Sequence, residues 1–120
     1  MTTSVVSSAT NPIAQKLDAI QQKAAMRSVD VANVAKVRQE TVSRWRSGKS
    51  FPQPETQKIL LELEYVADRL SEFYSPQEAR LWLLSRQKIL QGAVPAELIQ
   101  AGKTDDVIRV IDQLRDEVYL

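Results

Sequence analysis

Apolar residues recur along this chain at spacings of three and four, which places them on one face of an α-helix. The pattern is clearest between Pro54 and about Phe73, the longest predicted helix. Its apolar stripe consists of Ile59, Leu60, Leu63, Val66, Ala67 and Leu70. β-branched residues follow the same helical spacing and do not alternate as in a strand. The sequence therefore predicts an all-α fold, with the stripe interpreted as core and a dimer interface as its alternative.

The first half of the chain predicts three helices. Asn11 and Pro12 form a typical helix start, an N-cap followed by proline at the first helical position. Two short helices are expected around 29–35 and 39–47. Gly48 lies just past the second, where its freedom to adopt a positive φ suits a helix end. We expect the ten residues before Asn11 to be a disordered tail.

Further helices are predicted in the second half. Ser75 and Glu78 have the spacing of a capping box, so a helix begins there and runs to about residue 84. A short helical turn ends at Gly92, and Pro95 starts another helix that stops at Gly102. Thr104 is the predicted cap of the last helix. The four apolar residues of that helix predicted to face inward are Val107, Ile108, Ile111 and Leu114.

The two short helices of the first half have the residue types of a helix-turn-helix. Ala32 is small enough for the second helix to cross the first closely, and Val42 and Trp45 point inward. The polar residues left outside are predicted to meet DNA. Glutamine and arginine suit base edges, whereas serine, arginine and lysine suit phosphates. These residues are Arg38, Gln39, Glu40, Ser43, Arg44, Arg46, Ser47 and Lys49.

The segment from Val42 to Lys49, with proline soon after, resembles the Xre/Cro-type helix-turn-helix. That family usually has glycine in the turn, whereas this chain has Lys36. A left-handed conformation at lysine costs roughly 1 kcal/mol. Either Lys36 carries that strain or the turn has another shape.

The charges divide unevenly between the two halves. Residues 1–52 hold 8 Lys/Arg and 3 Asp/Glu, a net of +5, and residues 53–120 hold 8 and 12, a net of −4. The sum matches the overall charge of +1. A basic half favours a polyanionic partner and an acidic half favours a different one, although solvation alone accounts for a small imbalance.

Composition excludes most enzyme chemistry. The chain has no cysteine and no histidine, so thiolate or histidine metal sites and histidine-dependent triads are impossible. Three glycines are too few for a phosphate-binding loop. Asp105, Asp106 and Asp112 could bind a hard cation, but the first two flank a helix start, where the backbone dipole favours negative charge. We therefore expect no catalysis, no cofactor, no metal and no small-molecule substrate.

The second half resembles the toxin-binding domain of the Xre/MbcA/ParS antitoxin family. In that family a tryptophan helix precedes a Gly-x-x-Pro step, a Leu-x-x-x-Gly helix end and a final apolar helix. Trp82 matches the first feature, Gly92 and Pro95 the step, and Leu98 and Gly102 the helix end. Trp82 itself is interpreted as core. With the helix-turn-helix, the resemblance covers most of the chain from about residue 29.

The resemblance implies an antitoxin that occludes a RES-domain, NAD-consuming toxin and represses its own operon as a dimer on operator DNA. A toxin contact is predicted at the C-terminal end, with a frayed or self-packed end as the alternative: Arg109, Arg115, Glu117, Val118, Tyr119 and Leu120. The expected segments are a tail (1–10), a helix-turn-helix domain (11–52), a long connecting helix (53–74) and a toxin-binding domain (75–120).

Three other functions stay open. A stand-alone Xre-like dimeric regulator would use the C-terminal half for dimerisation or a small-molecule signal. An adaptor without DNA binding would keep only the toxin contact. An enzyme is disfavoured by the composition described above. No export signal or apolar run of about 20 residues is visible in the sequence, so we expect a soluble cytoplasmic protein with no membrane contact.

Overall fold

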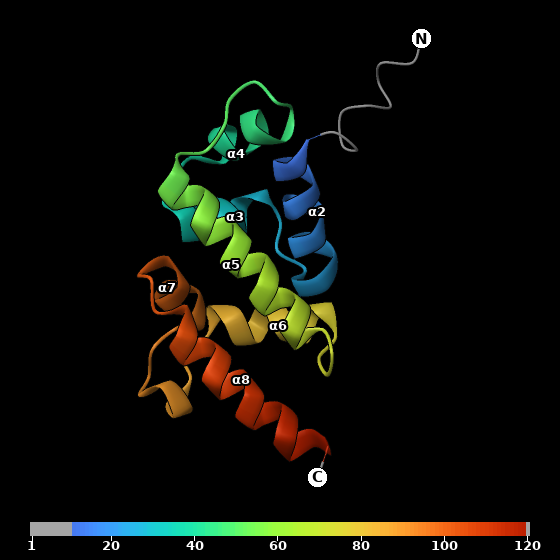
Figure 1. Cartoon of the computed structure of the whole chain (residues 1–120), viewed down its shortest axis with the longest axis vertical. Coiled ribbons are helices and arrows are strands. Elements are labelled where there is room, and N and C mark those ends of the chain that lie inside the picture. The colour runs from blue at the N-terminus through green and yellow to red at the C-terminus, as the bar shows by residue number, and fades with distance from the viewer. Residues whose placement is uncertain (1–10, 120) are drawn as a thin grey trace.

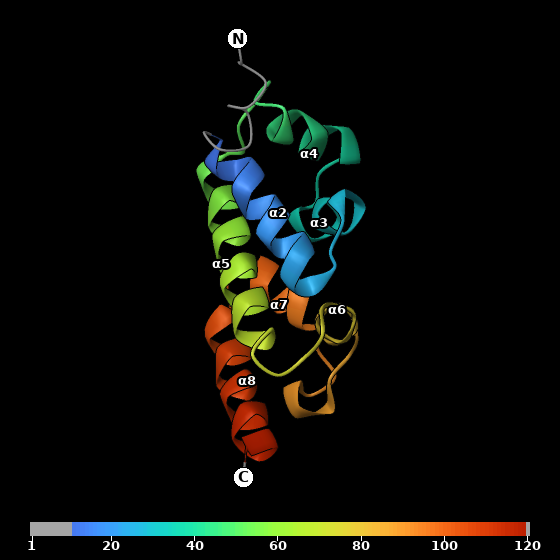
Figure 2. The same cartoon turned by 90° about the vertical axis from the view of Figure 1, so that its right-hand side faces the viewer.

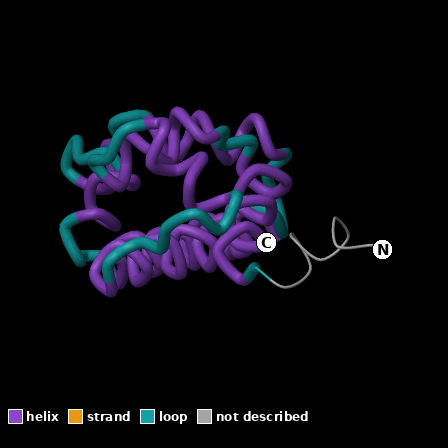
Figure 3. Tube along the Cα trace, turned by 90° about the horizontal axis from the view of Figure 1, so that it is seen from above, coloured by secondary structure: helices purple, strands orange, loops and turns teal. Residues whose placement is uncertain are grey.

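The computed structural model describes residues 11–119 and contains, within that range, seven α-helices, one short 3-10 helix and no β-strand (Figures 1 and 3). A single isolated bridge joins Gln87 to Ala93. The all-α prediction is confirmed, whereas the predicted tail at 1–10 and the toxin contact at Leu120 lie outside the described residues. The helices are α2 (Pro12–Ala24), α3 (Ser28–Ala35), α4 (Gln39–Arg46), α5 (Pro54–Leu70), α6 (Pro76–Leu84), α7 (Pro95–Gln100) and α8 (Thr104–Tyr119), with η2 (Lys88–Leu90) before α7.

The molecule is elongated, with principal extents of 52 × 27 × 20 Å. The helix-turn-helix lies at one end and α8 at the other, and α5 lies alongside α2 between them (Figures 1 and 2). One apolar cluster runs from Ile13 in α2 to Ile111 in α8, so the segments on both sides of α5 share a continuous core. None of the helices described within 11–119 combines the length and apolar character needed to cross a membrane.

The predicted start of α2 is confirmed. The Asn11 side-chain oxygen accepts hydrogen bonds from the backbone N–H groups of Ile13 and Ala14, at 3.1 and 3.2 Å. The same side chain donates through Nδ2 to the carbonyls of Trp45 and Arg46, at 3.2 and 3.3 Å. Asn11 therefore caps α2 and also satisfies carbonyls at the end of α4, which positions the two helices against each other.

The apolar stripe of α5 forms the middle of the core. Leu60, Leu63, Val66, Ala67 and Leu70 are fully buried within the single chain, and Ile59 is partly buried against the same cluster. The core interpretation is confirmed, and this stripe is not free to bind a second copy. The helix ends at Leu70, earlier than the expected Phe73, because the N–H groups of residues 71–74 bond back in a tight turn.

The C-terminal helices begin and end close to the predicted residues. Ser75 and Glu78 form the expected capping box at the start of α6. Gly92 and Gly102 adopt φ values of +84° and +83°. One detail differs. Thr104 is the first residue of α8, and its hydroxyl donates to Glu62 Oε1 of α5 at 2.5 Å. A partner on α5 fixes this end of α8 from outside the helix.

Candidate functional site

The outer face of α4 presents most of the residues predicted to meet DNA. Val42 is fully buried and Trp45 is 3% exposed, so the inner face of the helix is the predicted one. On the other side, seven of the eight predicted residues are exposed, and the eighth, Arg46, is half-buried. The exposed residues are Arg38, Gln39, Glu40, Ser43, Arg44, Ser47 and Lys49. Three cations and several amide and hydroxyl groups thus share one surface, which suits phosphate and base-edge contacts.

Arg46 differs from the rest of this set. Its guanidinium forms an ion pair with Asp18 of α2, and both side chains remain partly exposed. The pair ties the end of α4 to α2, in addition to the Asn11 bonds described above. Arg46 is therefore a positioning residue in this structure, and its charge is already partly compensated by a carboxylate. Gly48 follows with φ +80°, as predicted for the end of this helix.

The turn between α3 and α4 has the left-handed geometry usual for glycine. Lys36 adopts φ 61° and ψ 44°, and its backbone N–H donates to the Ala32 carbonyl. Of the two alternatives left open by the sequence, strain carried by lysine is the one observed. The turn thus keeps a helix-turn-helix shape at a local cost of roughly 1 kcal/mol.

A carboxylate–guanidinium pair joins this helix-turn-helix to the C-terminal half. Asp30 of α3 is 6% exposed, and Arg80 of α6 donates to both of its oxygens, at 3.2 and 3.0 Å. The Arg27 backbone N–H donates to the same carboxylate. Burial alone would raise the pKa of Asp30, but the Arg80 and Arg27 hydrogen bonds and positive charges hold that pKa below its usual value. Asp30 is therefore a buried, ionised anchor between the two halves.

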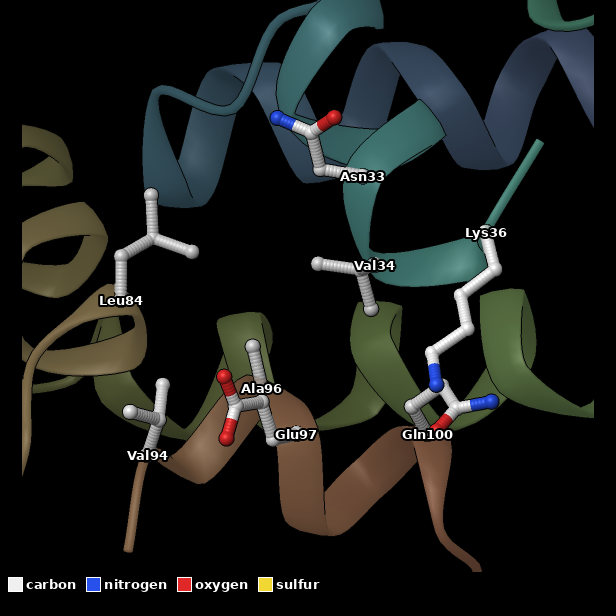
Figure 4. A pocket seen from close by; sticks show the side chains of 8 residues that line it. All are labelled: Asn33, Val34, Lys36, Leu84, Val94, Ala96, Glu97 and Gln100. Carbon is white, nitrogen blue, oxygen red and sulfur yellow. The ribbon is translucent and has the colours of Figure 1, made fainter. Parts of the chain in front are cut away.

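A cavity of about 340 Å³ lies at the junction of the two halves, between α3 and α7 (Figure 4). Four apolar and four polar side chains line it, and the Lys36 side chain extends toward Gln100. The lining residues are Asn33, Val34, Lys36, Leu84, Val94, Ala96, Glu97 and Gln100. Within residues 11–119 no group of three or more acidic side chains is arranged to hold a metal ion.

The described residues predicted to contact a toxin lie on α8, from Arg109 near its middle to Tyr119 at its end. Arg109 is exposed and pairs with Asp106, and Arg115 pairs with Glu72 of the α5–α6 turn at 3.6 Å. The Tyr119 hydroxyl donates to the Glu72 carbonyl at 2.9 Å. Glu117 and Val118 are exposed. The last turn of α8 is thus held at Glu72, while most of its side-chain surface faces solvent.

Two exposed apolar residues in the same half were not among the predicted site residues. Leu81 of α6 is 67% exposed, and Ile89 of η2 is 42% exposed. Leu81 also lines a hollow of about 390 Å³ beside Trp82, which itself is buried as predicted. The exposure of Leu81 could have been predicted from helical spacing, because its neighbours Ala79, Trp82 and Leu83 occupy the inner face of α6 and leave Leu81 on the outer face.

Comparison with known proteins shows similarity to antitoxins, although no protein-family model matches the chain. The chain is 27% identical over 110 residues to the mycobacterial cidal antitoxin MbcA of Mycobacterium tuberculosis, covering 92% of this chain and 97% of that protein. It is 29% identical over 92 residues to a probable mycobacterial cidal antitoxin of the same organism, covering 77% and 78%.

The structural comparison agrees. One chain in the crystal structure of the M. tuberculosis MbcT–MbcA toxin–antitoxin complex matches with a TM-score of 0.78 and 27% identity. The match covers 92% of this chain and 99% of that one. The order of helices and the sequence therefore agree over nearly the whole length of both chains, and the protein is similar to MbcA-type antitoxins in both sequence and fold.

Proposed function

We propose that the chain is the antitoxin of a toxin–antitoxin pair, which binds and occludes a RES-domain, NAD-consuming toxin and represses its own operon through α4. The observation that carries the proposal is the match to almost the whole of MbcA, in sequence and in the fold of a chain from a toxin–antitoxin complex. The non-enzymatic role expected from composition agrees with this similarity. The chain acts by covering the toxin.

The surface that supports toxin binding is the end of α8. Tyr119 and Val118 are 67% and 56% exposed, so two large apolar side chains face solvent within one helical turn. Tyrosine and arginine are common anchors of protein interfaces, and Arg115 lies one turn earlier. Glu72 holds the tyrosine hydroxyl and the Arg115 guanidinium, so this surface is ordered before a partner arrives.

The surface that supports operator binding is the outer face of α4. It carries Gln39 and Arg44, which suit base edges, on a helix fixed by the buried Trp45. A dimer would place two such helices on successive half-sites of the operator. The Lys36 turn preserves the geometry that this use of α4 requires.

Co-expression with the product of the adjacent gene tests the proposal. We expect this chain to relieve that protein's toxicity and to copurify with it. A stand-alone regulator, the alternative function, would bind its operator yet neither relieve toxicity nor copurify. The cavity beneath the helix-turn-helix would then be the place to seek a small-molecule signal.

A further inference from the structure

The cavity between α3 and α7 is lined by four polar side chains that are free to bind another molecule. Asn33 and Lys36 come from α3 and the turn that ends it, and Glu97 and Gln100 come from α7. Within residues 11–119, none of these four side chains forms a hydrogen bond or an ion pair. The cavity thus holds one ammonium, one carboxylate and two amides that the fold itself does not use.

Lys36 reaches this cavity from a strained position. Its backbone is left-handed, at φ 61°, a conformation that glycine adopts without cost. The chain nevertheless keeps a long side chain there, and that side chain extends toward Gln100 across the cavity (Figure 4). Strained backbone positions are found preferentially where they place a group for binding. The Lys36 ammonium is therefore placed to receive an anionic group.

The lining of the cavity changes from apolar to charged in a fixed order. Val94, Glu97 and Gln100 recur at every third residue, so they follow one side of α7 at steps of about 4.5 Å. Figure 4 shows the same order, with Leu84 and Val94 toward one end, Lys36 and Gln100 toward the other, and Glu97 between them. An apolar end is thus followed by a carboxylate, and then by an ammonium beside an amide.

We propose that this cavity binds a free aliphatic amino acid. The carboxylate of the ligand bonds to the Lys36 ammonium and the Gln100 amide, and its ammonium bonds to the Glu97 carboxylate. Its side chain lies against Leu84 and Val94. An apolar acid without an ammonium would meet the like charge of Glu97, and an amine without a carboxylate would meet that of Lys36. A zwitterion compensates both charges.

The size of the cavity agrees with this class of ligand. Its volume of about 340 Å³ lies at the lower end of the range for small-molecule sites, ~300–1,000 Å³, which favours a small ligand over a nucleotide. Val34 and Ala96 complete the apolar lining, and both are buried members of the core. The apolar wall is therefore fixed before a ligand arrives, as the sites of small ligands commonly are.

A ligand in this cavity would contact both halves of the molecule. Lys36 lies in the turn that leads into α4, whereas Glu97 and Gln100 belong to the C-terminal half. The amino acid would brace the turn that positions α4, and its binding should raise the thermal midpoint by mass action. The inference does not rest on toxin neutralisation or on operator binding, because an antitoxin and a stand-alone regulator would have the same cavity.

Titration calorimetry of the full chain with L-leucine and two analogues of its carbon chain tests the site. Of the analogues, 4-methylpentanoate lacks the ammonium and 3-methylbutylamine lacks the carboxylate. We expect L-leucine to bind with a dissociation constant on the order of 1 mM or below, and each analogue at least about tenfold more weakly. Backbone amide resonances of residues 33–36 and 94–100 should shift on binding.

Three results would overturn the proposal. The first is no binding of L-leucine, L-isoleucine, L-valine or L-methionine up to about 10 mM, well above the expected constant. The second is an analogue that binds as tightly as L-leucine, because the cavity would then not recognise a zwitterion. The third is a set of shifted resonances that lies away from the cavity.

Two substitutions test the assigned contacts. Lys36→Met keeps the length of the side chain and removes its charge, so the dissociation constant of L-leucine should rise at least about tenfold. Glu97→Gln should also weaken L-leucine, yet it should bind 4-methylpentanoate more tightly than the wild type does, because a repulsive charge is removed. Lys58→Met, at an exposed lysine of α5 outside the cavity, is the matched control and should bind L-leucine normally. Unchanged L-leucine affinity in Lys36→Met or Glu97→Gln, with folding verified by circular dichroism, contradicts the proposed contacts.

Discussion

The Asp30 carboxylate accepts two hydrogen bonds from the Arg80 guanidinium, which joins α3 of the helix-turn-helix to α6 across 50 residues. Among residues 11–119, no buried side-chain polar atom lacks a hydrogen-bond partner. Asp30 is the most buried carboxylate in that range, and Arg80 is its main hydrogen-bond partner. The surface predicted to bind DNA and the surface predicted to bind toxin thus rest on one packed structure, whose halves are tied by a charged anchor.

Removing Arg80 should destabilise the whole chain. Arg80→Ala leaves the Asp30 carboxylate buried without its main partner, and we expect a loss of about 1–3 kcal/mol in the free energy of unfolding, since Arg80 is itself partly exposed. Urea denaturation measures the change. Arg109→Ala is the control, because it removes only the exposed ion pair between Arg109 and Asp106, which lie one helical turn apart on α8. Equal midpoints for Arg80→Ala and wild type would show that the pair is not an anchor.

Relieving the turn strain should stabilise the chain. Lys36→Gly allows φ 61° without a Cβ clash and is expected to add about 0.5–1 kcal/mol, the relief being partly offset by the greater flexibility of unfolded glycine. Lys36→Ala removes the same charge and side chain but keeps the Cβ, so it should not stabilise. Thermal denaturation of the two variants separates backbone from side-chain effects. A gain for alanine as large as that for glycine would contradict the strain.

The sequence predicted the elements whose signals are local. Asn11, Ser75 with Glu78, and Gly48 are capping and termination signals read within one helical turn, and all three lie where expected. The inner face of α4 was likewise predicted, because Val42 and Trp45 follow helical spacing.

The contacts that the sequence did not predict are long-range. Nothing near Asp30 in the sequence indicates that its partner is Arg80. Arg46 belongs to the set predicted to meet DNA, but its ion pair with Asp18 could not be predicted, because it depends on how α2 and α4 pack. Thr104 was predicted to cap α8 from its local sequence position, whereas its hydroxyl donates to Glu62 of α5, a contact that also depends on helix packing. Pairings of this kind are fixed only when helices dock.

Operator binding should depend on Arg44. In a gel-shift assay with the promoter of its own operon, the wild type should shift the DNA, and Arg44→Ala should weaken binding at least about tenfold, since a bidentate arginine–base contact contributes ~1–3 kcal/mol. Arg86→Ala, a cation on the C-terminal half, should bind as the wild type does. Absence of any shift by the wild type would leave toxin neutralisation as the remaining role.

Toxin affinity should depend on the end of α8. A chain ending at Leu114 lacks the Arg115 pair and the Tyr119 bond to Glu72, together with the exposed Val118. We expect its affinity for the toxin to fall at least about tenfold, while its urea midpoint shifts little, because the removed residues are largely exposed. Calorimetric titration of the toxin compares the two chains. Undiminished affinity would place the toxin contact elsewhere on the molecule.

The central claim is that this chain neutralises an NAD-consuming toxin by occluding it. The most direct measurement is the rate of NAD consumption by the purified product of the adjacent gene as this chain is titrated into it. We predict that the rate falls to background when the toxin is saturated, at a fixed molar ratio. A rate that stays unchanged at saturating concentrations of the folded chain would contradict the account.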